Sequence, residues 1–234
     1  MLPPSQTFIR YQGESLKDFQ AYYAGSKLVP GISLPHDRTI VLNKGDVIGA
    51  GLEALFKVTG NSLVLQRRLE PLRASLIHAH FGTDGAQALG LAESLRLPLI
   101  VTFHGYEVTT LDSYARRSFL IHRRYSHRRQ RLKERAALFI AVSEFIAERL
   151  ILQGFPESRI RVHYIGTEIN ARPRVPLIER ESIVLFVGRL AEVKGCTFLI
   201  DAMAILQEEI PEARLVVIGD GPLRPQLEAD ARRK

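Results

Sequence analysis

The sequence predicts an α/β protein whose strands pair in parallel. Short apolar runs that are typical of strands alternate along the chain with stretches of helical periodicity, and this alternation indicates strand–helix–strand units. Residues 166–181 interrupt this alternation and divide it into two parts. They are rich in proline and charge and show neither the period of a strand nor that of a helix. We therefore expect one domain at residues 1–165, a linker at residues 166–181, and a second domain at residues 182–234.

The start of the chain carries the weaker pattern. Ser5 can cap a helix, since its hydroxyl can accept a hydrogen bond from a free backbone N–H. Proline and glycine separate the runs that follow. The expected elements are a helix at residues 6–19, strands at residues 21–24 and 39–42, and helices at residues 48–58 and 63–69.

A stronger alternation of strands and helices begins at Ser75. Apolar runs of strand length are separated by segments that have the length and period of helices. Ser143 can cap one of these helices and Gly154 can end it. The expected elements are strands at residues 75–80, 99–103, 138–142 and 160–165, a turn at residues 82–85, and helices at residues 86–95, 113–136 and 144–153.

The alternation of strands and helices resumes after the linker. Residues 183–187 are all apolar, and we expect them to form a buried strand. A helix at residues 196–208, a strand at residues 215–218 and a helix from Pro222 should follow. Since a domain of this kind needs about 100 residues or more, the second domain is expected to be incomplete.

Composition places the chain among soluble globular proteins. Apolar residues make up 46% of it, and no apolar run approaches the length of a membrane span. The first residues lack the charged start and the apolar stretch of a signal peptide. The single cysteine, Cys196, excludes an intramolecular disulfide and a cysteine-rich metal site, and we expect it to face the sheet from a helix. A cytoplasmic location is therefore expected.

The positive charge is concentrated in one predicted helix. Residues 116–135 contain nine Arg or Lys and one acid, a sum of +8, so the rest of the chain contributes −1 to the net charge of +7. Ile121, Tyr125, Leu132 and Ala136 are spaced to bury one face of this helix. The other face carries Arg123, Arg124, Arg128 and Arg129.

Two interpretations of this cationic face are a solvated surface and a docking site for an anionic membrane surface or a lipid-diphosphate acceptor, and we favour docking. Nucleic acid is not expected as a partner. The helix lacks interleaved aromatic side chains, and no nucleic-acid-binding module is recognisable.

The strongest motif is Gly188-Arg-Leu-Ala-Glu-Val-Lys-Gly195, between a strand and a helix. In open α/β sheets ligands bind beyond the carboxyl ends of strands, where a helix N-terminus offers free N–H groups to an anion. Arg189 and Lys194 bracket the turn and can converge on one diphosphate. Gly188 permits a sharp turn, and Gly195 lets the helix start close to the ligand. The alternative is a solvated loop with incidental charges, and the spacing is not that of a Walker A loop.

Other polar residues at strand ends carry weaker signals. Gly219-Asp220-Gly221 is either a generic turn or a part of the same ligand site. His78 and His80 alternate with apolar residues, so they are either a metal pair or structural strand-end histidines, and we favour the structural role.

Together these motifs resemble the retaining GT-B glycosyltransferases of family four. Phe186–Gly195 and Leu215–Pro222 resemble the family's nucleotide-sugar domain. Upstream, Pro4–Ile9 is similar to the family's Pro-Ser-Glu-Thr-Phe-Ile segment, His78-Ala-His80 to its His-x-His strand, and Thr102–Glu107 to its Thr-x-His-Gly-x-Asp segment. The matching pieces follow the family's order over nearly the whole chain. Within the family, enzymes of polysaccharide and lipopolysaccharide assembly of the colanic-acid type look most similar.

The resemblance implies two Rossmann-like domains and the transfer of a sugar from a nucleotide sugar to a glycan or lipid-linked acceptor. It implies that Arg189 and Lys194 hold the donor diphosphate and that Gly219–Gly221 help to shape the donor site. It also implies that His104 lies near the transferred sugar, where an imidazole can donate to a hydroxyl or stabilise charge. No metal or other cofactor is expected, since enzymes of this fold generally need none.

Two features depart from the family pattern. Glu107 and Glu168 stand where the family usually has aspartate, and we assign no catalytic role to Glu107. The family's first strand and its Glu-x7-Glu segment are not in the sequence, so we expect a fragment, truncated at both ends and inactive by itself. Two alternatives remain open, a nucleotide-sugar epimerase of the same fold and a non-catalytic binding remnant.

Overall fold

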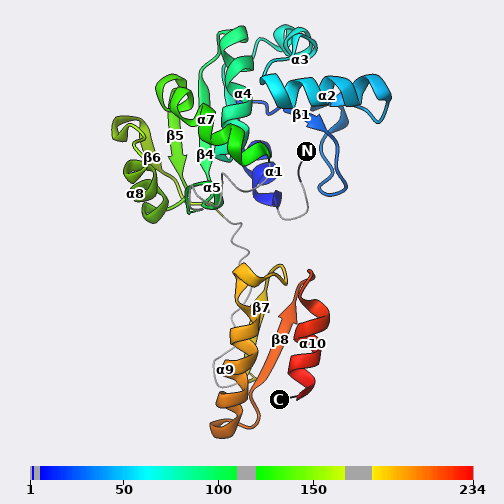
Figure 1. Cartoon of the computed structure of the whole chain (residues 1–234), viewed down its shortest axis with the longest axis vertical. Helices are drawn as coiled ribbons and strands as arrows, with labels where there is room; N and C mark the ends of the chain where they lie inside the picture. The colour runs from blue at the N-terminus through cyan, green and yellow to red at the C-terminus, as the bar shows by residue number, and fades with distance from the viewer. Residues whose placement is uncertain (1, 3–5, 110–119, 167–180, 234) are drawn as a thin grey trace. The chain divides into compact units, whose positions relative to one another are not determined.

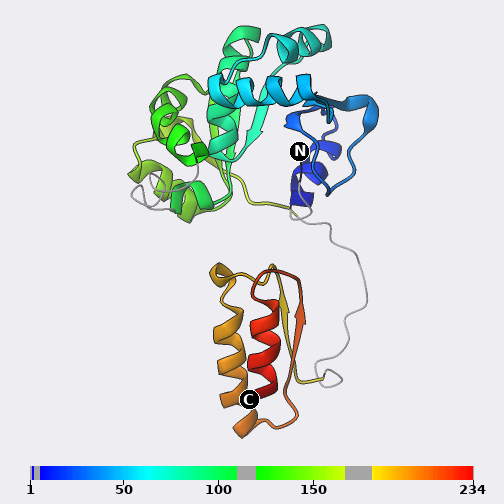
Figure 2. The same cartoon turned by 45° about the vertical axis from the view of Figure 1, so that its right-hand side comes forward.

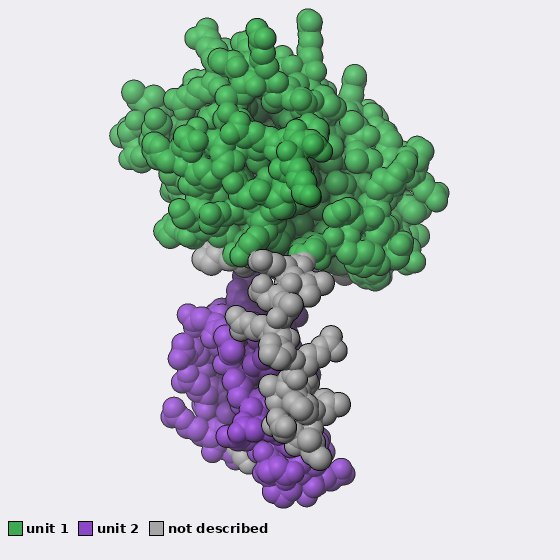
Figure 3. Space-filling model, turned by 180° about the vertical axis from the view of Figure 1, so that it is seen from behind, with its two compact units in different colours: residues 1–167 green, residues 168–234 purple. Residues whose placement is uncertain are grey.

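The computed structural model describes residue 2 and residues 6–109, 120–166 and 181–233 (Figure 1). The chain divides into two compact units, residues 1–167 and residues 168–234 (Figure 3). Residues 167–180, which make up most of the expected linker, lie outside the described residues. Each unit is built on parallel strands, so the predicted α/β class is confirmed.

The centre of the first unit is a parallel sheet of four strands. In spatial order, which is also chain order, they are β3 (Ile77–His80), β4 (Leu99–Phe103), β5 (Leu138–Ala141) and β6 (Ile160–Val162). Helix α4 (Gly82–Leu95) packs on β3 and β4 and against α7 (Leu120–Arg135), and α8 (Glu144–Leu152) packs on β5 and β6. Because helices cover the sheet, strand residues such as Phe103 and Phe139 are fully buried.

Two boundaries of this sheet differ from the prediction. The expected turn at residues 82–85 is wrong, because α4 already begins at Gly82. The strand expected at residues 160–165 ends at Val162, where its pairing with β5 stops. Short 3-10 helices punctuate the connections at His36–Arg38, Glu70–Leu72, Glu157–Arg159 and Glu192–Lys194.

A separate two-stranded parallel sheet lies earlier in the unit. It consists of β1 (Tyr23–Lys27) and β2 (Thr39–Asn43), and within the described part of the chain β2 does not pair with β3. Helices α2 (Val47–Thr59) and α3 (Leu63–Leu69) follow β2, as predicted. One apolar cluster joins these elements to α4, and its buried members are Leu42, Phe56, Leu65 and Leu91.

Side-chain caps begin several helices of the unit. Ser143 caps α8 as predicted, since its Oγ accepts the N–H of Ile146 at 3.3 Å. Asp46 and Ser62 cap α2 and α3 in the same way. Ser5, expected to cap the first helix, lies outside the described residues.

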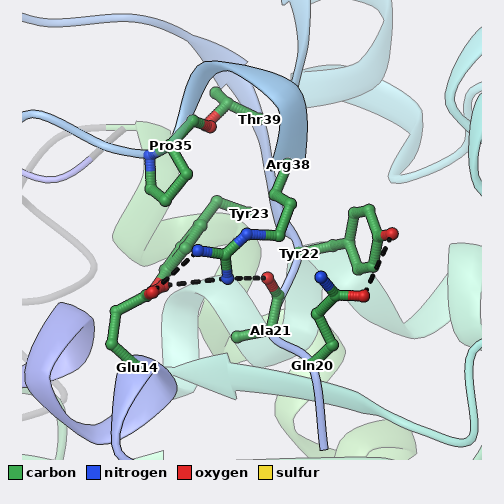
Figure 4. Close-up of polar contacts among 8 residues, drawn as sticks. All are labelled: Glu14, Gln20, Ala21, Tyr22, Tyr23, Pro35, Arg38 and Thr39. Atoms are coloured by element: carbon green, nitrogen blue, oxygen red, sulfur yellow. Dashed lines mark hydrogen bonds and ion pairs between the residues drawn. The ribbon is translucent and has the colours of Figure 1, made fainter.

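The first helix is shorter than expected, and a distant arginine binds its last residue. Helix α1 (Thr7–Glu14) ends at Glu14 rather than near residue 19. The Glu14 carboxylate accepts the two terminal nitrogens of Arg38, at 3.1 and 2.7 Å, and the hydroxyl of Tyr23 at 2.7 Å (Figure 4). Arg38 also donates to the backbone oxygen of Ala21 at 3.0 Å. Burial and the neighbouring Glu14 raise the pKa of Tyr23 to about 12, so its hydroxyl stays a donor.

The second unit is a two-stranded parallel sheet with two helices on one face (Figure 2). Its elements are β7 (Ile183–Val187), α9 (Cys196–Glu209), β8 (Arg214–Ile218) and α10 (Arg224–Arg233). Phe186 and Leu215 turn toward the helices and pack on Cys196, which is buried as predicted. Leu185 and Val187 are exposed on the other face, so the prediction that this strand is buried is wrong. No described helix covers that face.

Candidate active site

Three histidines lie together at the carboxyl end of the central sheet of the first unit. His78 and His80 share a face of β3, and His104 directly follows β4. The His78 and His80 rings stack with centroids 4.5 Å apart. His80 Nδ1 lies 3.2 Å from His104 Nε2, and these two rings are inclined by only 24°. The structure thus brings the predicted site residue His104 into contact with His80, which we expected to be structural.

The low pKa values of these imidazoles keep them neutral near pH 7. Burial lowers the pKa of His78. Burial, with the charges of its two neighbours, lowers the pKa of His80 to about 3. Burial and the charge of His78 lower the pKa of His104 to about 4. One neutral ring must therefore donate and the other accept in the contact between His80 and His104.

Two aromatic rings contact the His104 side chain. The rings of Phe8 and Phe81 lie 4.7 and 4.6 Å from its ring, centroid to centroid. Phe81 has φ 73°, a left-handed conformation that is strained for a phenylalanine and places it at the start of α4. His104 Nδ1 is buried and has no hydrogen-bond partner among the described residues. An unpaired buried nitrogen marks a position where a ligand hydroxyl or a water can bind.

Glu107 organises the loop that carries His104. It lies in α5 (Tyr106–Thr109), and its buried Oε1 accepts the backbone N–H of His104 at 3.1 Å and that of Gly82 at 3.2 Å. Burial raises the pKa of Glu107, and its hydrogen bonds from backbone N–H groups oppose that change. The carboxylate therefore joins the end of β4 to the N-terminus of α4. Glu168, the other departure from the family pattern, lies outside the described residues.

The predicted anion loop of the second unit leads from β7 to the N-terminus of α9. Gly188 N–H donates to Ile218 O at 3.0 Å, and Leu190 N–H donates to Asp220 O at 2.9 Å, so the loop is bound to the segment after β8. Gly195 has φ 67° and stands at the N-cap of α9, a conformation that favours glycine as expected.

Close backbone packing holds the Gly219–Gly221 segment against this loop. A Cβ on Gly219 would lie 1.8 Å from Gly188 O, and one on Gly221 would lie 2.4 Å from Leu190 O. A Cβ on Gly188 would meet only the Phe186 ring, at an ordinary 3.5 Å. The position at which a side chain would clash most severely is therefore Gly219 rather than Gly188, although the sequence motif around Gly219 was the weaker of the two.

Arg189 and Lys194 extend from this loop into solvent. Both side chains are exposed, and neither has a hydrogen bond or an ion pair within the residues that the structure describes. The loop thus presents two uncommitted cations beside the N-terminus of a 14-residue helix. Asp220 is exposed as well, and its carboxylate lies 3.7 Å from Arg224 of α10.

The cations of α7 differ in their surroundings. Arg128 is half-buried and donates to the backbone oxygen of Val58 at 2.7 Å and to Gln87 Oε1 at 3.4 Å. Arg129 is also half-buried and donates to Gln153 Oε1 at 3.2 Å. The side chains of the other two predicted docking residues, Arg123 and Arg124, lie outside the described residues.

No metal centre is recognisable among the residues that the structure describes. None of their His, Cys, Asp and Glu side chains form a group of three that could hold an ion. The close approach of the three imidazoles is instead a hydrogen bond and a ring stack.

The fold agrees with the families that the chain matches. Residues 30–170 match the model of Glycosyltransferase Family 4, and residues 168–234 match that of Glycosyl transferases group 1. The chain therefore belongs to the family-four glycosyltransferases of the GT-B fold.

Two relatives are about equally similar in sequence. TuaC of Bacillus subtilis, a glycosyltransferase named for teichuronic acid biosynthesis, is 32% identical over 69% of this chain and 41% of its own length. WcaL of Escherichia coli K12, named for colanic acid biosynthesis, is 32% identical over 67% of this chain and 38% of its own length. The chain thus spans about two fifths of the length of these relatives.

Solved structures support the fold. Sucrose-phosphate synthase from Thermosynechococcus elongatus matches with a TM-score of 0.61 and 21% identity, over 98% of this chain and 60% of that one. HepE of Anabaena, solved in complex with UDP, matches with a TM-score of 0.58 and 19% identity, over 83% of this chain and 52% of that one.

Proposed function

We propose that the protein to which this chain belongs moves a sugar from a nucleoside-diphosphate sugar to a glycan or lipid-linked acceptor, with retention at the sugar carbon. The observation that carries the proposal is the Gly188–Gly195 loop. It carries two exposed cations, Arg189 and Lys194, next to the N-terminus of α9, where helix N–H groups can bind an anion. HepE, a relative in fold, was solved with UDP and with UDP-glucose, which supports a nucleotide donor.

The loop suits a diphosphate for a physical reason. Arg189 can bind two phosphate oxygens at once, and Lys194 can add a point charge from the other end of the loop. Because Gly219 and Gly221 hold the loop against the segment after β8, the cations extend from a fixed backbone. Negative charge that develops on the leaving nucleotide would be stabilised there.

His104 would act on the sugar as a neutral hydrogen-bonding group. Its pKa near 4 disfavours an imidazolium at pH 7, so it offers a directed N–H or a lone pair rather than a charge. The neighbouring rings of Phe8 and Phe81 make the surroundings of its ring partly apolar, where such a bond is stronger than in water. We propose that no metal takes part in the transfer.

The experiment is a titration of the ¹⁵N-labelled chain with UDP, followed by NMR. The amides of Gly188, Gly195 and Cys196 should shift, since they surround the proposed phosphate position. Arg189→Ala and Lys194→Ala should each weaken UDP binding by about 1.5–3 kcal/mol, the range of charge-assisted hydrogen bonds. His104→Ala should leave UDP affinity unchanged, and it should lower turnover in an active enzyme.

Arg214→Ala is the matched control. Arg214 is an exposed arginine of the same unit, but it begins β8 and is paired with Glu181 at 2.6 Å, away from the loop. If both loop variants bind UDP as tightly as the parent, the diphosphate assignment is wrong. Membership of a glycosyltransferase family favours transfer over epimerisation, and turnover without an acceptor would identify an epimerase. A binding remnant would take up UDP and show no turnover.

A further inference from the structure

The segments that follow the four strands of the central sheet carry acids but no Lys or Arg. They lie at the carboxyl edge of the sheet, where the parallel strands end, and comprise residues 81–85, 104–109, 142–145 and 163–166. Their acids are Asp84, Glu107 and Glu144. The cation that follows in α8, Arg149, packs over the Phe145 ring, 5.1 Å from its centroid. These segments are therefore negatively charged, although the net charge of the chain is +7.

Asp84 is the acid of this edge that lies beside Glu107. It stands in the first turn of α4 and is exposed to solvent. Within the part of the chain that the structure describes, its carboxylate has no hydrogen bond and no ion pair. The surrounding protein removes part of its water, and this desolvation, together with the charge of Glu107, raises the pKa of Asp84 to about 6. Above that pH both a carboxylate and a neighbouring carboxyl group face any ligand at this edge.

Unpaired donors and acceptors lie close to Asp84. The backbone N–H groups of Thr83 and Asp84 begin α4 and have no acceptor among the described residues. Glu107 Oε2 is buried and has no donor among the same residues, because Oε1 accepts the N–H groups of Gly82 and His104. A hydroxyl group can donate to an oxygen and accept from an N–H, so it suits such a mixture of partners.

Aromatic rings accompany these polar groups. Phe8 and Phe81 contact His104 and are partly exposed, and Tyr106 in α5 is 55% exposed. A sugar ring has an apolar face of C–H groups and a rim of hydroxyls. A few polar groups beside aromatic rings can therefore bind both parts of a sugar.

We propose that the carboxyl edge of the first unit selects an uncharged sugar as the acceptor, and that Asp84 determines this selectivity. The selectivity rests on the function proposed above, which supplies the transfer reaction. Hydroxyls of the acceptor would donate to the Asp84 carboxylate and accept from the free N–H groups of α4. A sugar that carries a carboxylate or a phosphate at this position would be repelled by Asp84 and Glu107, and the four segments offer no Lys or Arg to offset the repulsion.

Two features favour an uncharged sugar over a cationic ligand. The N-terminus of α4, a helix of 14 residues, places a partial positive charge at the same position. An ammonium group can only donate, so it would leave the N–H groups of Thr83 and Asp84 without an acceptor. The selected group is the sugar of the acceptor and not an attached lipid. Within the described residues, no helix combines the length and the apolar character needed to cross a membrane.

The test compares two sugars that differ in one group. Methyl glucoside and methyl glucuronide share a ring, and only the glucuronide carries a carboxylate. Each is titrated into the whole ¹⁵N-labelled chain without UDP, at physiological salt and about pH 7.5, where Asp84 is mainly ionised. The amides of Thr83, Asp84 and Gly105 should shift, and the glucoside should bind about fivefold or more tightly than the glucuronide. The net charge of +7 would by itself favour the glucuronide, so the expected order is informative.

Asp84→Asn keeps the shape of the side chain and removes its charge. The preference for the glucoside should fall to about twofold or less, mainly because the glucuronide binds more tightly. The matched control is Glu157→Gln, since Glu157 is an exposed acid just before β6, at the opposite edge of the same sheet, and its loss should leave the preference unchanged. Unchanged amide shifts in β5 would show that both variants are folded.

Three results would overturn the proposal: equal affinities for the two sugars in the parent chain, an unchanged preference in Asp84→Asn, or no amide shift at this edge with either sugar. Choline, a cation with one hydroxyl, is a third probe, and tighter binding of choline than of the glucoside also overturns it. None of these results involves the second unit. The UDP titration of the Gly188–Gly195 loop tests the donor site separately, so the failure of one proposal can be distinguished from the failure of the other.

Discussion

The contact between His80 and His104 determines how His104 can act. The hydrogen bond between these two neutral imidazoles contains one hydrogen, which belongs to the ring that donates it. The direction of the bond therefore determines which nitrogen of His104 carries a hydrogen. His104 Nδ1, the nitrogen on the far side, is then either a donor or an acceptor toward a ligand, but not both. His80 is thus a positioning residue for His104 in the proposed reaction.

This role predicts the behaviour of His80→Leu. With the partner removed, His104 should change from a single tautomer to a mixture, which long-range ¹H–¹⁵N correlation spectra of histidine-labelled protein would show. His78→Phe is the control, because it keeps a ring stacked on His80 and has no hydrogen bond to His104. An unchanged His104 spectrum in His80→Leu would exclude the positioning role.

The same histidines predict that the chain is destabilised by acid. Their folded pKa values lie below the unfolded value of about 6.5, so the unfolded state binds protons first and stability falls as pH drops below that value. At pH 5 the loss for His80 should be about 2 kcal/mol. Burial raises the pKa of Glu107, which acts in the opposite direction. Urea unfolding between pH 7.5 and 5 measures the slope, which His80→Leu should flatten and His163→Leu, at an exposed position, should not.

Only part of this site could be predicted from residue patterns. The two loop cations were predicted from a strand–turn–helix motif, which is local, and His104 was predicted from the family resemblance. The left-handed Phe81 could not be predicted, because phenylalanine rarely adopts that conformation and only the packing of α4 explains it here. The part that Glu107 plays as an acceptor of backbone N–H groups could not be predicted either, because it depends on Gly82, which is distant in sequence.

At the scale of elements, α7 shows that a cluster of arginines in the sequence can include side chains that bind neighbouring elements of the fold. Three of the four residues of the predicted apolar stripe are buried, Tyr125, Leu132 and Ala136. The side chain of the fourth, Ile121, lies outside the described residues. Arg128 and Arg129, however, are bound to neighbouring parts of the unit. Replacing all four predicted docking arginines together would therefore disturb packing as well as any membrane contact, so the membrane role of this helix stays a prediction that must be tested through Arg123 and Arg124.

Arg128→Gln should lower the free energy of unfolding by about 1 kcal/mol, because the backbone oxygen of Val58 loses a charged donor at the end of α2. Arg135→Gln, at an exposed position near the end of the same helix, is the control and should change stability by less than about 0.5 kcal/mol. Chemical denaturation measures both. Equal stability of the two variants would show that Arg128 contributes no more than a solvated charge.

The elements that were predicted well are those that local signals define. Ser143 begins α8, and the apolar runs of β4 and β5 are strands as expected. The end of α1 was predicted wrongly, and the contact that Arg38, 24 residues away, makes with Glu14 could not be predicted from a local pattern. The burial of β7 was wrong because burial depends on a second layer of helices, and an apolar run carries no information about whether that layer is present.

At the scale of the whole molecule, the two compact units meet in sequence at residues 167 and 168. The composition of residues 166–181 predicts a linker that cannot form a core, because it is rich in proline and charge. Limited proteolysis should therefore cut within these residues first and release the first unit. Mass spectrometry of the earliest fragments measures this. First cuts inside the strands, with residues 166–181 intact, would contradict the boundary.

Among the described residues, no helix covers one face of the sheet in the second unit, and this affects how strongly its loop can hold any ligand. Two strands with helices on one side form a small cooperative unit, and a sheet of this size has little stability of its own. Some molecules will have this unit open at any moment, and its amides should exchange with solvent faster than those of β4 and β5. When a ligand binds only the closed form, part of the binding free energy is used to close the unit. The measured dissociation constant is then the intrinsic constant divided by the fraction of molecules in the closed form. The affinity of the Gly188–Gly195 loop is therefore coupled to the folding of the strands that carry it.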